Sequence, residues 1–263
     1  MQLVDTHCHI HDEEYNYDIP AILKNAKDQG VETIICIGTS ALDSQRAVRF
    51  VEDKPDLYAA VGLHPHDAKL GEDDFEVLAT LVGNPKVVAI GEFGLDYYYG
   101  NSPKEDQLKA LRYQLELAIS ANKPCVFHIR ESFGEPVGIE GSAFKDFFEV
   151  FDEYTGVRGV VHSFSATQTE LEECLKRGLY ISLNGIMTFS KVESQLDAAR
   201  AVPLEKLLLE TDSPFLTPAP KRGTINEPAN VRLVAEFLSR LRGESITTLA
   251  ETTTGNAHTL FGI

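Results

Sequence analysis

The chain has 263 residues, of which 43% are hydrophobic and 24% charged, a composition typical of a soluble globular protein. Its 24 basic and 40 acidic residues give a formal net charge of −16, which argues against a broad surface that neutralises phosphates, although a bound metal would add local positive charge. No apolar run approaches the roughly 20 residues that span a bilayer, and no signal peptide is recognisable, so we expect a cytoplasmic protein without membrane contact.

The chain has four cysteines, which lie far apart and form no CxxC pair. Cys36 and Cys125 stand inside apolar, strand-like runs, where a cysteine behaves as a small buried hydrophobic residue. We expect Cys8, Cys36, Cys125 and Cys174 all to be reduced and structural, as is usual in the cytosol.

Short apolar segments alternate with longer amphipathic segments along the whole chain, as strands alternate with helices in α/β proteins. The sequence predicts eight strands, at residues 3–9, 31–38, 57–63, 87–92, 124–129, 157–164, 179–183 and 206–210. It predicts helices at residues 18–30, 41–53, 102–121, 142–154, 167–177, 190–201, 229–241 and 245–251, a further helix capped by Asp73 or Asp74, and a short turn at residues 256–261.

Capping residues mark several of the predicted helix boundaries. Asp18 precedes a helix with Pro20 near its first turn, where the missing N–H of proline costs nothing. Ser102 and Pro103 form a similar start, with Ser102 as the capping residue and acidic residues in the first turn. Gly178 suits the left-handed cap that ends a helix.

Eight strands that are each followed by a helix predict a (β/α)8 TIM barrel of the α/β class, in a single domain that spans residues 1–263. The length is usual for one such barrel, and no linker, low-complexity tract or break in composition divides the chain. A doubly wound open sheet is the main alternative, but no G-x-G-x-x-G motif follows the first strand to support its nucleotide-binding version.

Residues that can bind metals or take part in catalysis gather where the predicted strands end. His7 and His9 alternate along the first strand, so they share one face while Cys8 points the other way. In barrels of this kind the chemistry lies at the C-terminal ends of the strands, so we expect later strand ends to complete the site. Those ends carry His64, His66, Glu92, Asp96, His128, Arg130, His162, Ser163, Glu210 and Asp212, whereas we expect His11 and His258 to be structural.

Imidazoles and carboxylates that converge at one end of a barrel predict a site for a divalent metal such as zinc, manganese or nickel. The donors outnumber one tetrahedral shell, which indicates two metal ions that share an acidic ligand. Such a pair would activate a water molecule and stabilise the entering and leaving oxygens of a phosphodiester. Asp212 would then be placed to accept the proton of that water.

Many of these residues stand in motifs that resemble the TatD family of metal-dependent hydrolases, within the wider amidohydrolase-type barrels. The resemblance covers nearly the whole chain in order, and its Gly-Glu-x-Gly-Leu-Asp and Glu-Thr-Asp blocks are specific. The matching stretches are residues 5–9, 62–66, 91–97, 123–130, 162–165, 208–216, 226–228 and 255–261.

The resemblance implies a deoxyribonuclease that trims single-stranded DNA from the 3′ end and uses two divalent metal ions. Magnesium or manganese would support activity, and zinc or nickel would also fit the donors. The expected partner is therefore a nucleic acid substrate, and we expect the protein to be a monomer.

The resemblance also assigns roles to individual residues. One metal ion would be held by His7, His9, Glu92 and Asp212. Glu92 would bridge to the second ion, which His128 and His162 complete, so Glu92 and Asp212 are the expected catalytic residues. His64 would contact the scissile phosphate or position water. Arg130 would contact phosphate, and the alternative for Arg130 is a salt bridge to a neighbouring strand-end acid.

Two aromatic groups have different expected roles. Tyr97, Tyr98 and Tyr99 could stack on nucleobases, but we favour the alternative that Tyr97 packs on the barrel while the other two shield the loop. Four phenylalanines recur at helical spacing and are expected to face the core, namely Phe144, Phe147, Phe148 and Phe151.

The sequence departs from the family pattern in two places. A Gly-rich loop with three glutamates intervenes at residues 131–141, and Ala166 stands where the family usually has glycine. We expect the loop to narrow the mouth of the site and to disfavour long or duplex nucleic acid.

Two other functions stay open on the sequence alone. The first is an amide or ester hydrolase, such as a lactonase, a deaminase or an aminoacyl-tRNA deacylase. Those barrels often carry a carboxylated lysine as the metal bridge, and no lysine stands at a strand end here. The second is a scaffold with a vestigial metal site, which is disfavoured because no expected ligand is missing.

Overall fold

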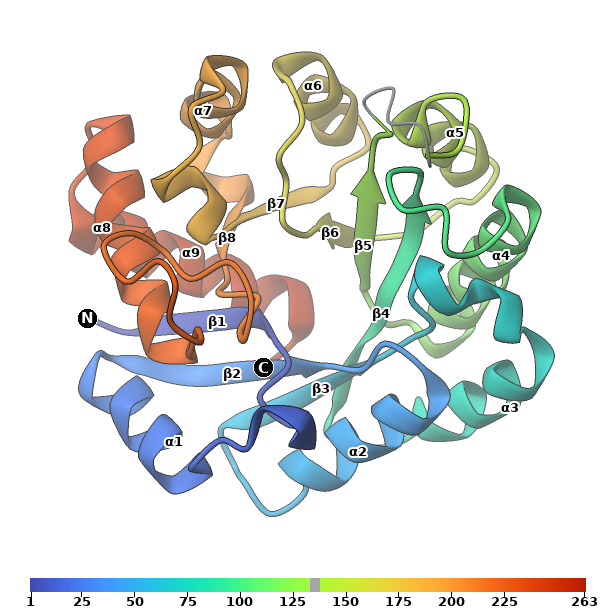
Figure 1. The fold of residues 1–263 in the computed structure, drawn as a ribbon, viewed down its shortest axis with the longest axis horizontal. Coiled ribbons are helices and arrows are strands. Elements are labelled where there is room, and N and C mark those ends of the chain that lie inside the picture. Colours follow the sequence, from blue (N-terminus) through green and yellow to red (C-terminus); the bar gives the residue numbers. More distant parts are fainter. Residues whose placement is uncertain (133–137) are drawn as a thin grey trace. The chain divides into compact units, whose positions relative to one another are not determined.

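The fold is built from eight parallel strands that alternate with helices (Figure 1). The computed structural model describes residues 1–132 and 138–263, and in helix α3 it describes the backbone but not the side chain of Glu72. The strands follow one another in chain order, β1 to β8, within one eight-stranded sheet. This is the pattern of a (β/α)8 TIM barrel, so the predicted fold is confirmed.

The chain divides into two compact units. The first unit comprises residues 1–36, 53–58 and 162–263, and the second comprises residues 37–52 and 59–161. The single domain expected for residues 1–263 stays a prediction.

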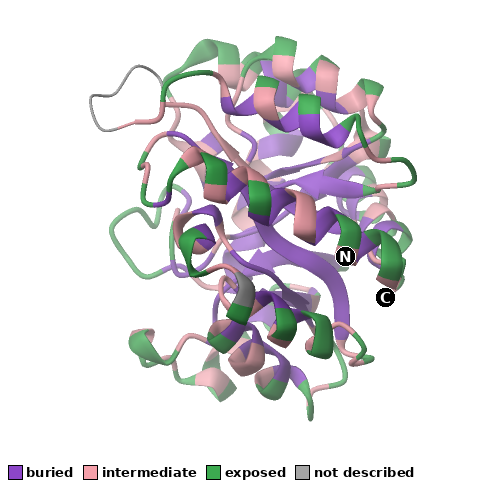
Figure 2. Cartoon of the chain, turned by 90° about the vertical axis from the view of Figure 1, so that its right-hand side faces the viewer, coloured by how far each residue is buried: buried purple, intermediate pink, exposed green. Residues whose placement is uncertain are grey.

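The strands of the first unit are buried along almost their whole length, and buried segments are purple in Figure 2. They are β1 (Leu3–Cys8), β2 (Val31–Ile37), β7 (Tyr180–Leu183) and β8 (Leu207–Leu209). In the pair β1–β2, Leu3 lies opposite Val31 and Cys8 lies opposite Cys36. The helices of this unit are α1 (Ile19–Asp28), α6 (Gln168–Lys176), α7 (Glu193–Ala201), α8 (Val231–Arg242) and α9 (Ile246–Phe261).

The second unit contains an aromatic core between its strands and α5. Its strands are β4 (Val87–Asp96), β5 (Cys125–Arg130), β6 (Gly159–Val161) and residues 59–61 of β3 (Leu57–Val61), whose first two residues belong to the first unit. Its helices are α2 (Ala41–Val51), α3 (Glu72–Leu81), α4 (Lys104–Ala121) and α5 (Ala143–Phe151). The ring of Phe127 lies 5.2 Å from that of Phe93 and 4.9 Å from that of Phe147. All four phenylalanines of α5 are buried, so their predicted place in the core is confirmed.

Local sequence accounts for several helix starts. Asp18 accepts a hydrogen bond from Ala21 N–H at the start of α1, with Pro20 in the first turn, as predicted. Ser142 and Thr167 cap α5 and α6 in the same way. Gly178 has φ +75°, so it lies in the left-handed conformation that its position after α6 requires.

Two predicted caps are wrong because tertiary contacts take the side chains elsewhere. Ser102 Oγ donates to His66 O and accepts from Lys69 N–H, so Ser102 does not cap α4, which begins after Pro103. Neither Asp73 nor Asp74 caps α3, whose preceding residue is Gly71. Asp74 instead accepts from the N–H of Ala41 at the start of α2.

The predicted boundary near the C-terminus is also wrong. Residues 246–261 form one continuous helix, α9, rather than a helix followed by a separate turn. Asn256 in the middle of α9 donates to Leu204 O and to Leu207 O, both at 2.8 Å. These bonds to the segment around β8 stabilise the helix at Asn256, although asparagine usually disfavours a helix.

All four cysteines are free and buried, as predicted. Cys8 Sγ lies 3.6 Å from Ile35 O on β2, so its side chain faces the neighbouring strand. Every helix in the described part of the chain is too short or too polar to cross a bilayer.

Candidate metal centre

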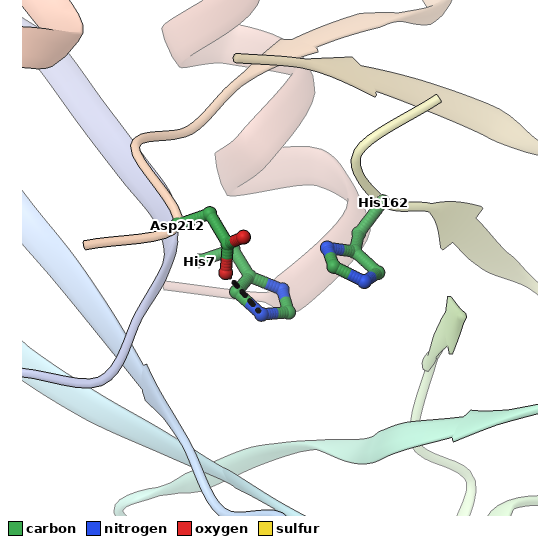
Figure 3. A group of neighbouring side chains, drawn as sticks. All are labelled: His7, His162 and Asp212. Atoms are coloured by element: carbon green, nitrogen blue, oxygen red, sulfur yellow. Dashed lines mark ion pairs between the residues drawn. The ribbon is translucent and has the colours of Figure 1, made fainter. Parts of the chain in front are cut away.

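Three side chains of the first unit form a group whose ligand atoms all lie within 4.8 Å of one another (Figure 3). They are His7 on β1, His162 directly after β6, and Asp212 just beyond β8. We call them the first donor group. Each stands in or beyond the C-terminal half of a strand. Parallel strands bring those ends to the same edge of a sheet, which is why the three side chains meet.

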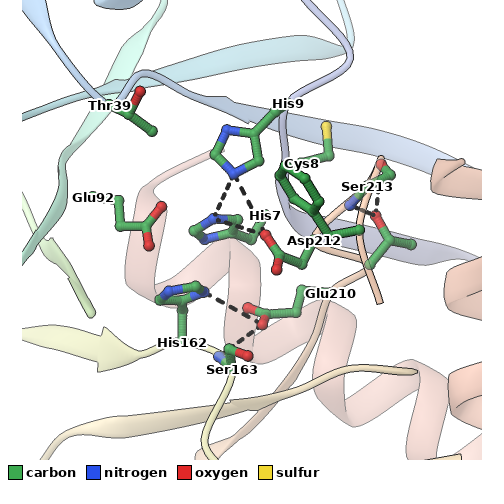
Figure 4. Close-up of polar contacts among 12 residues, drawn as sticks. His7, Cys8, His9, Thr39, Glu92, His162, Ser163, Glu210, Asp212 and Ser213 are labelled. Atoms are coloured by element: carbon green, nitrogen blue, oxygen red, sulfur yellow. Dashed lines mark hydrogen bonds and ion pairs between the residues drawn. The ribbon is translucent and has the colours of Figure 1, made fainter. Parts of the chain in front are cut away.

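His9 adds a fourth donor on the same side of β1 (Figure 4). His7 Nε2 lies 3.3 Å from His9 Nε2, and Asp212 Oδ1 lies 3.6 Å and 3.4 Å from these two nitrogens. The rings of His7 and His162 are stacked, with centroids 4.0 Å apart and planes 10° apart. The nitrogens and the carboxylate oxygen therefore converge on one small volume, as ligands of one cation do.

The backbone holds Asp212 in an uncommon conformation. Its φ is +56°, in the left-handed region that non-glycine residues seldom adopt. Asp212 N–H donates to His7 O at 2.8 Å, and Asp212 O accepts from Phe215 N–H at 2.8 Å. The carboxylate is thereby tied to the strand that carries the histidines.

The residue before Asp212 is fixed by a buried carboxyl group. Asp5 accepts from Thr211 N–H at 2.8 Å and from Thr211 Oγ1 at 2.6 Å. Burial raises the pKa of Asp5 well above its usual value, against the opposing effect of these hydrogen bonds. Asp5 therefore links β1 to the segment that carries Asp212.

Glu210 is a buried carboxyl group behind His162 (Figure 4). Its Oε1 lies 3.6 Å from His162 Nδ1 and accepts from Ser163 N–H at 2.7 Å and from Asn184 Nδ2 at 3.0 Å. Burial would raise the pKa of Glu210, but the nearby imidazole of His162 lowers it below the usual value. Glu210 is thus electrostatically linked to His162.

Asn184 is a candidate site residue that sequence reasoning missed. It directly follows β7, one of the two strands at whose ends no polar residue was proposed. Its position immediately after the predicted strand at residues 179–183 was the available signal.

The second unit contains its own group of three, which we call the second donor group: His64, Glu92 and His128, again within 4.8 Å. His128 Nδ1 lies 2.8 Å from Glu92 Oε1, and His64 Nε2 lies 3.4 Å from both of these atoms. Burial lowers the pKa of His64 to about 4, which favours the neutral imidazole. Its Nδ1 accepts from His66 N–H at 3.1 Å, so the proton of the neutral ring lies on Nε2.

Close contact between two backbone segments explains why glycine stands at positions 62 and 91. A Cβ on Gly62 would lie 2.5 Å from Gly91 C, so only glycine lets β4 approach the segment after β3. This approach brings the segment that carries His64 beside Glu92.

Asp96 lies on the other side of His128. Its Oδ2 is 3.0 Å from His128 Nε2 and 3.1 Å from His66 Nε2, and its Oδ1 accepts from the N–H groups of Tyr98 and Tyr99. Burial would raise the pKa of Asp96, but these hydrogen bonds hold it well below the usual value. The sequence analysis placed both Asp96 and His66 at strand ends, and the structure shows that their side chains contact each other.

Arg130 packs over aromatic rings at the end of β5. Its guanidinium carbon lies 4.3 Å from the ring centre of Tyr98 and 4.8 Å from that of Tyr99, and Tyr97 is fully buried. The expected packing of Tyr97 on the barrel is therefore confirmed, whereas the shielding of the loop by Tyr98 and Tyr99 stays a prediction. Among the described residues Arg130 has no carboxylate in ion-pair range, so the alternative salt bridge is absent there.

Two remaining histidines lie outside both donor groups among the residues described. His11 is buried, and its ring lies 6.3 Å from that of His9. His258 is exposed, with Nδ1 2.5 Å from Ile263 O at the end of α9.

Glu131 has a role that the sequence did not indicate. Its carboxylate accepts from Ser142 Oγ at 2.7 Å and from the N–H groups of Ala143 and Phe144 at 3.1 Å. This glutamate caps α5. Residues 133–137, with a second glutamate of the loop, lie outside the described residues, so the narrowing of the mouth stays a prediction.

Both donor groups fit a divalent metal ion by their chemistry. Each combines imidazole nitrogens with a carboxylate oxygen, the ligand set that zinc, manganese and related ions accept. The structure places His162 with His7 and Asp212, whereas the resemblance assigned it to the second ion with His128. It also places His64 among possible ligands rather than only beside the substrate.

Comparisons with known proteins agree with this chemistry. The TatD_DNase family, described as TatD related DNase, matches residues 4–262. The chain is 37% identical over 265 residues to an uncharacterized metal-dependent hydrolase, YabD, of Bacillus subtilis, covering 99% of both chains. It is 33% identical over 257 residues to the 3′-5′ ssDNA/RNA exonuclease TatD of Shigella flexneri, covering 95% of both.

A solved structure shows the same similarity in three dimensions. The crystal structure of YJJV, a TatD homolog from Escherichia coli, matches with a TM-score of 0.89 and 30% identity, over 99% of this chain and 98% of that one.

Proposed function

The chain belongs to the TatD-related DNase family of metal-dependent hydrolases, and on this premise we propose that it hydrolyses phosphodiester bonds in nucleic acid. Single-stranded DNA, trimmed from the 3′ end, is the proposed substrate, since one relative is named as such an exonuclease. The observation that carries the proposal is the first donor group, whose three ligand atoms lie within 4.8 Å.

The metal sites are proposed from the donors of each unit. His7, His9, His162 and Asp212 would hold one divalent ion, and Glu92 and His128 offer donors for another. A bound divalent ion lowers the pKa of water and stabilises negative charge on phosphate oxygens. The expectation that Glu92 bridges two ions stays a prediction, which metal counting on Glu92→Gln tests.

Asp212 is the proposed proton acceptor. Its side chain is 14% exposed and its backbone is pinned by His7 and Phe215, so the carboxylate is accessible and fixed in position. A positioned carboxylate can take the proton from water as that water attacks phosphorus.

Arg130 and His64 are the proposed phosphate contacts. Packing of Arg130 on Tyr98 and Tyr99 fixes the guanidinium in place, and its N–H groups suit the oxygens of a phosphate. His64 could donate to a phosphate oxygen or position water, as the sequence suggested.

Removal of metal tests the proposal directly. Treatment with a chelator should abolish cleavage, and manganese or magnesium should restore it, because the donor groups would hold the ions that activate water. The assay compares single-stranded DNA, duplex DNA, RNA, an aminoacyl ester and a lactone, each with magnesium, manganese and zinc. Cleavage by the metal-free protein would refute the mechanism, and activity on the ester or lactone alone would replace the nuclease by the alternative hydrolase.

The assembly and location of the enzyme are also proposals. We propose a monomer that acts in the cytoplasm. Light scattering of the purified protein and fractionation of cells that produce it test these two statements.

A further inference from the structure

One large aromatic side chain stands exposed beside the first donor group. Phe215 is 49% exposed and lies three residues after Asp212, in the loop that follows β8. Its ring centroid is 6.3 Å from that of His9. About half of the surface of this residue is exposed, so a ligand that covered the ring would gain the free energy of burying aromatic surface.

The backbone around Phe215 is held firmly although the ring is exposed. Phe215 N–H donates to Asp212 O at 2.8 Å, and Phe215 O accepts from Asn226 Nδ2 at 2.7 Å. Asn226 also donates to Thr211 O, and the Tyr17 hydroxyl donates to Asn226 O at 2.7 Å. A ring mounted on a fixed backbone loses little conformational freedom when a ligand stacks on it.

Tyr15 extends the aromatic surface. Its ring centroid lies 5.9 Å from that of Phe215, and the planes are 87° apart, so the rings meet edge to face. Tyr15 ends the short helix η1 (Glu13–Tyr15), in which Glu13 and Glu14 are exposed. These acids disfavour a phosphate next to Tyr15, whereas a nucleobase is uncharged and stacks on aromatic faces.

We propose that Phe215 and Tyr15 form a subsite that stacks one nucleobase of the substrate. The inference rests on the proposed function and adds the feature by which the same site would recognise a nucleotide. The ring of Phe215 lies 6.3 Å from that of His9, whose Nε2 is 3.4 Å from Asp212 Oδ1 and 3.3 Å from His7 Nε2. The stacked base would therefore belong to a nucleotide whose phosphate lies at the donor group.

Substitution of Phe215 with leucine separates stacking from simple apolar contact. Phe215→Leu retains an apolar side chain but removes the aromatic face. The substrates are two single-stranded DNA oligonucleotides of equal length, one with thymine and one with abasic sites at its 3′-terminal positions. Phe215→Leu should raise KM for the thymine oligonucleotide about 5- to 150-fold, which is the loss of ~1–3 kcal/mol per stacked base. KM for the abasic oligonucleotide and kcat for both should stay unchanged.

Two further variants control this measurement. Ile225 is 58% exposed in the same loop, and Ile225→Ala should leave both KM values unchanged. Tyr15→Leu should shift KM in the same direction as Phe215→Leu, because it removes the ring that packs against the phenyl ring. Circular dichroism confirms that each variant is folded.

A binding probe makes the test independent of turnover. A 2-aminopurine at the 3′ end of the oligonucleotide loses fluorescence when it stacks, and we expect quenching by the wild type and by Ile225→Ala but not by Phe215→Leu. Absence of quenching by the wild type, or an equal rise in KM for both oligonucleotides, overturns the stacking subsite. A wild type that quenches the probe but cleaves neither oligonucleotide overturns the proposed function and leaves the subsite standing.

Discussion

Asp96 and Glu210 are carboxylates that each lie beside a histidine of a donor group. Asp96 Oδ2 contacts His128 Nε2 at 3.0 Å, while His128 Nδ1 faces Glu92 on the other side at 2.8 Å. A histidine held in this way donates from one nitrogen and keeps the lone pair of the other for a metal. Glu210 Oε1 lies 3.6 Å from His162 Nδ1, beyond hydrogen-bond distance, so its influence on that ring is electrostatic. At the residue scale, Asp96 fixes the orientation of His128.

Replacement of Asp96 with asparagine should weaken metal binding. The amide is uncharged and has one acceptor oxygen, so it cannot serve the two imidazoles and the two backbone N–H groups as the carboxylate does. We therefore expect a 10- to 100-fold loss of manganese affinity, an order of magnitude typical of such partners. Isothermal titration calorimetry measures the affinity. Asp53→Asn, an exposed aspartate after α2, is the matched control and should bind as the wild type. Unchanged affinity in Asp96→Asn would show that His128 needs no such partner.

Replacement of Asp212 with asparagine should separate metal binding from turnover. The fold and much of the metal should be retained, because His7, His9 and His162 are unchanged, while turnover falls about 10²- to 10⁴-fold with the loss of the proton acceptor. Metal content and initial rates on single-stranded DNA are the measurements. Turnover like that of the wild type would refute the role assigned to Asp212.

At the scale of elements, tertiary contacts override some local helix signals. Asp74 and Ser102 have the residue types of caps, but both side chains bond to neighbouring elements instead. Conversely, Glu131 lies eleven residues before Ser142 and joins it at the start of α5. A loop residue distant in sequence thus satisfies the N–H groups that a helix leaves unpaired.

Removal of the Glu131 carboxylate should destabilise the protein. Glu131→Ala loses three hydrogen bonds at the start of α5, so we expect a free energy of unfolding lower by roughly 1–2 kcal/mol, as for the loss of a helix cap. Urea denaturation measures this change. Glu140→Ala changes an exposed glutamate of the same loop and should have little effect. Equal stability of both variants would show that Glu131 does not stabilise the protein as a helix cap.

At the scale of the whole molecule, the protein has a net charge of −16. The fold shifts the pKa values of some of its buried carboxyl groups in opposite directions. Burial raises the pKa of Asp5, whereas hydrogen bonds from His128 and His66 lower the pKa of Asp96 despite burial. The stability of the protein in acid therefore depends on individual carboxyl groups more than on the total charge.

Asp96 should contribute to unfolding in acid. A carboxyl group with a lowered pKa stabilises the folded state above its unfolded-state pKa of about 4, and this contribution is lost as the pH falls further. We expect the free energy of unfolding of the metal-free wild type to fall more steeply between pH 6 and pH 3 than that of Asp96→Asn. Urea denaturation across this range measures both slopes, and equal slopes would assign the acid sensitivity to other groups.

The alternation of strands and helices could be predicted from sequence because it depends on local patterns of apolar residues and turns. Because chemistry in such barrels lies at the C-terminal strand ends, residues such as His7, Glu92 and Asp212 could be proposed as candidates without coordinates. Helix α9 shows the limit of local patterns, since Asn256 is stabilised by bonds to residues about fifty positions away.

Only the tertiary structure decided how the polar residues are grouped within each unit. It placed His162 with His7 and Asp212, joined Asp96 to His66 and His128, and added Asn184 beside Glu210. These relations depend on strand register and on the direction of each side chain, which arise from packing between segments far apart in the chain. The sequence therefore determined which residues stand at strand ends, and the packed structure determined which of them act together.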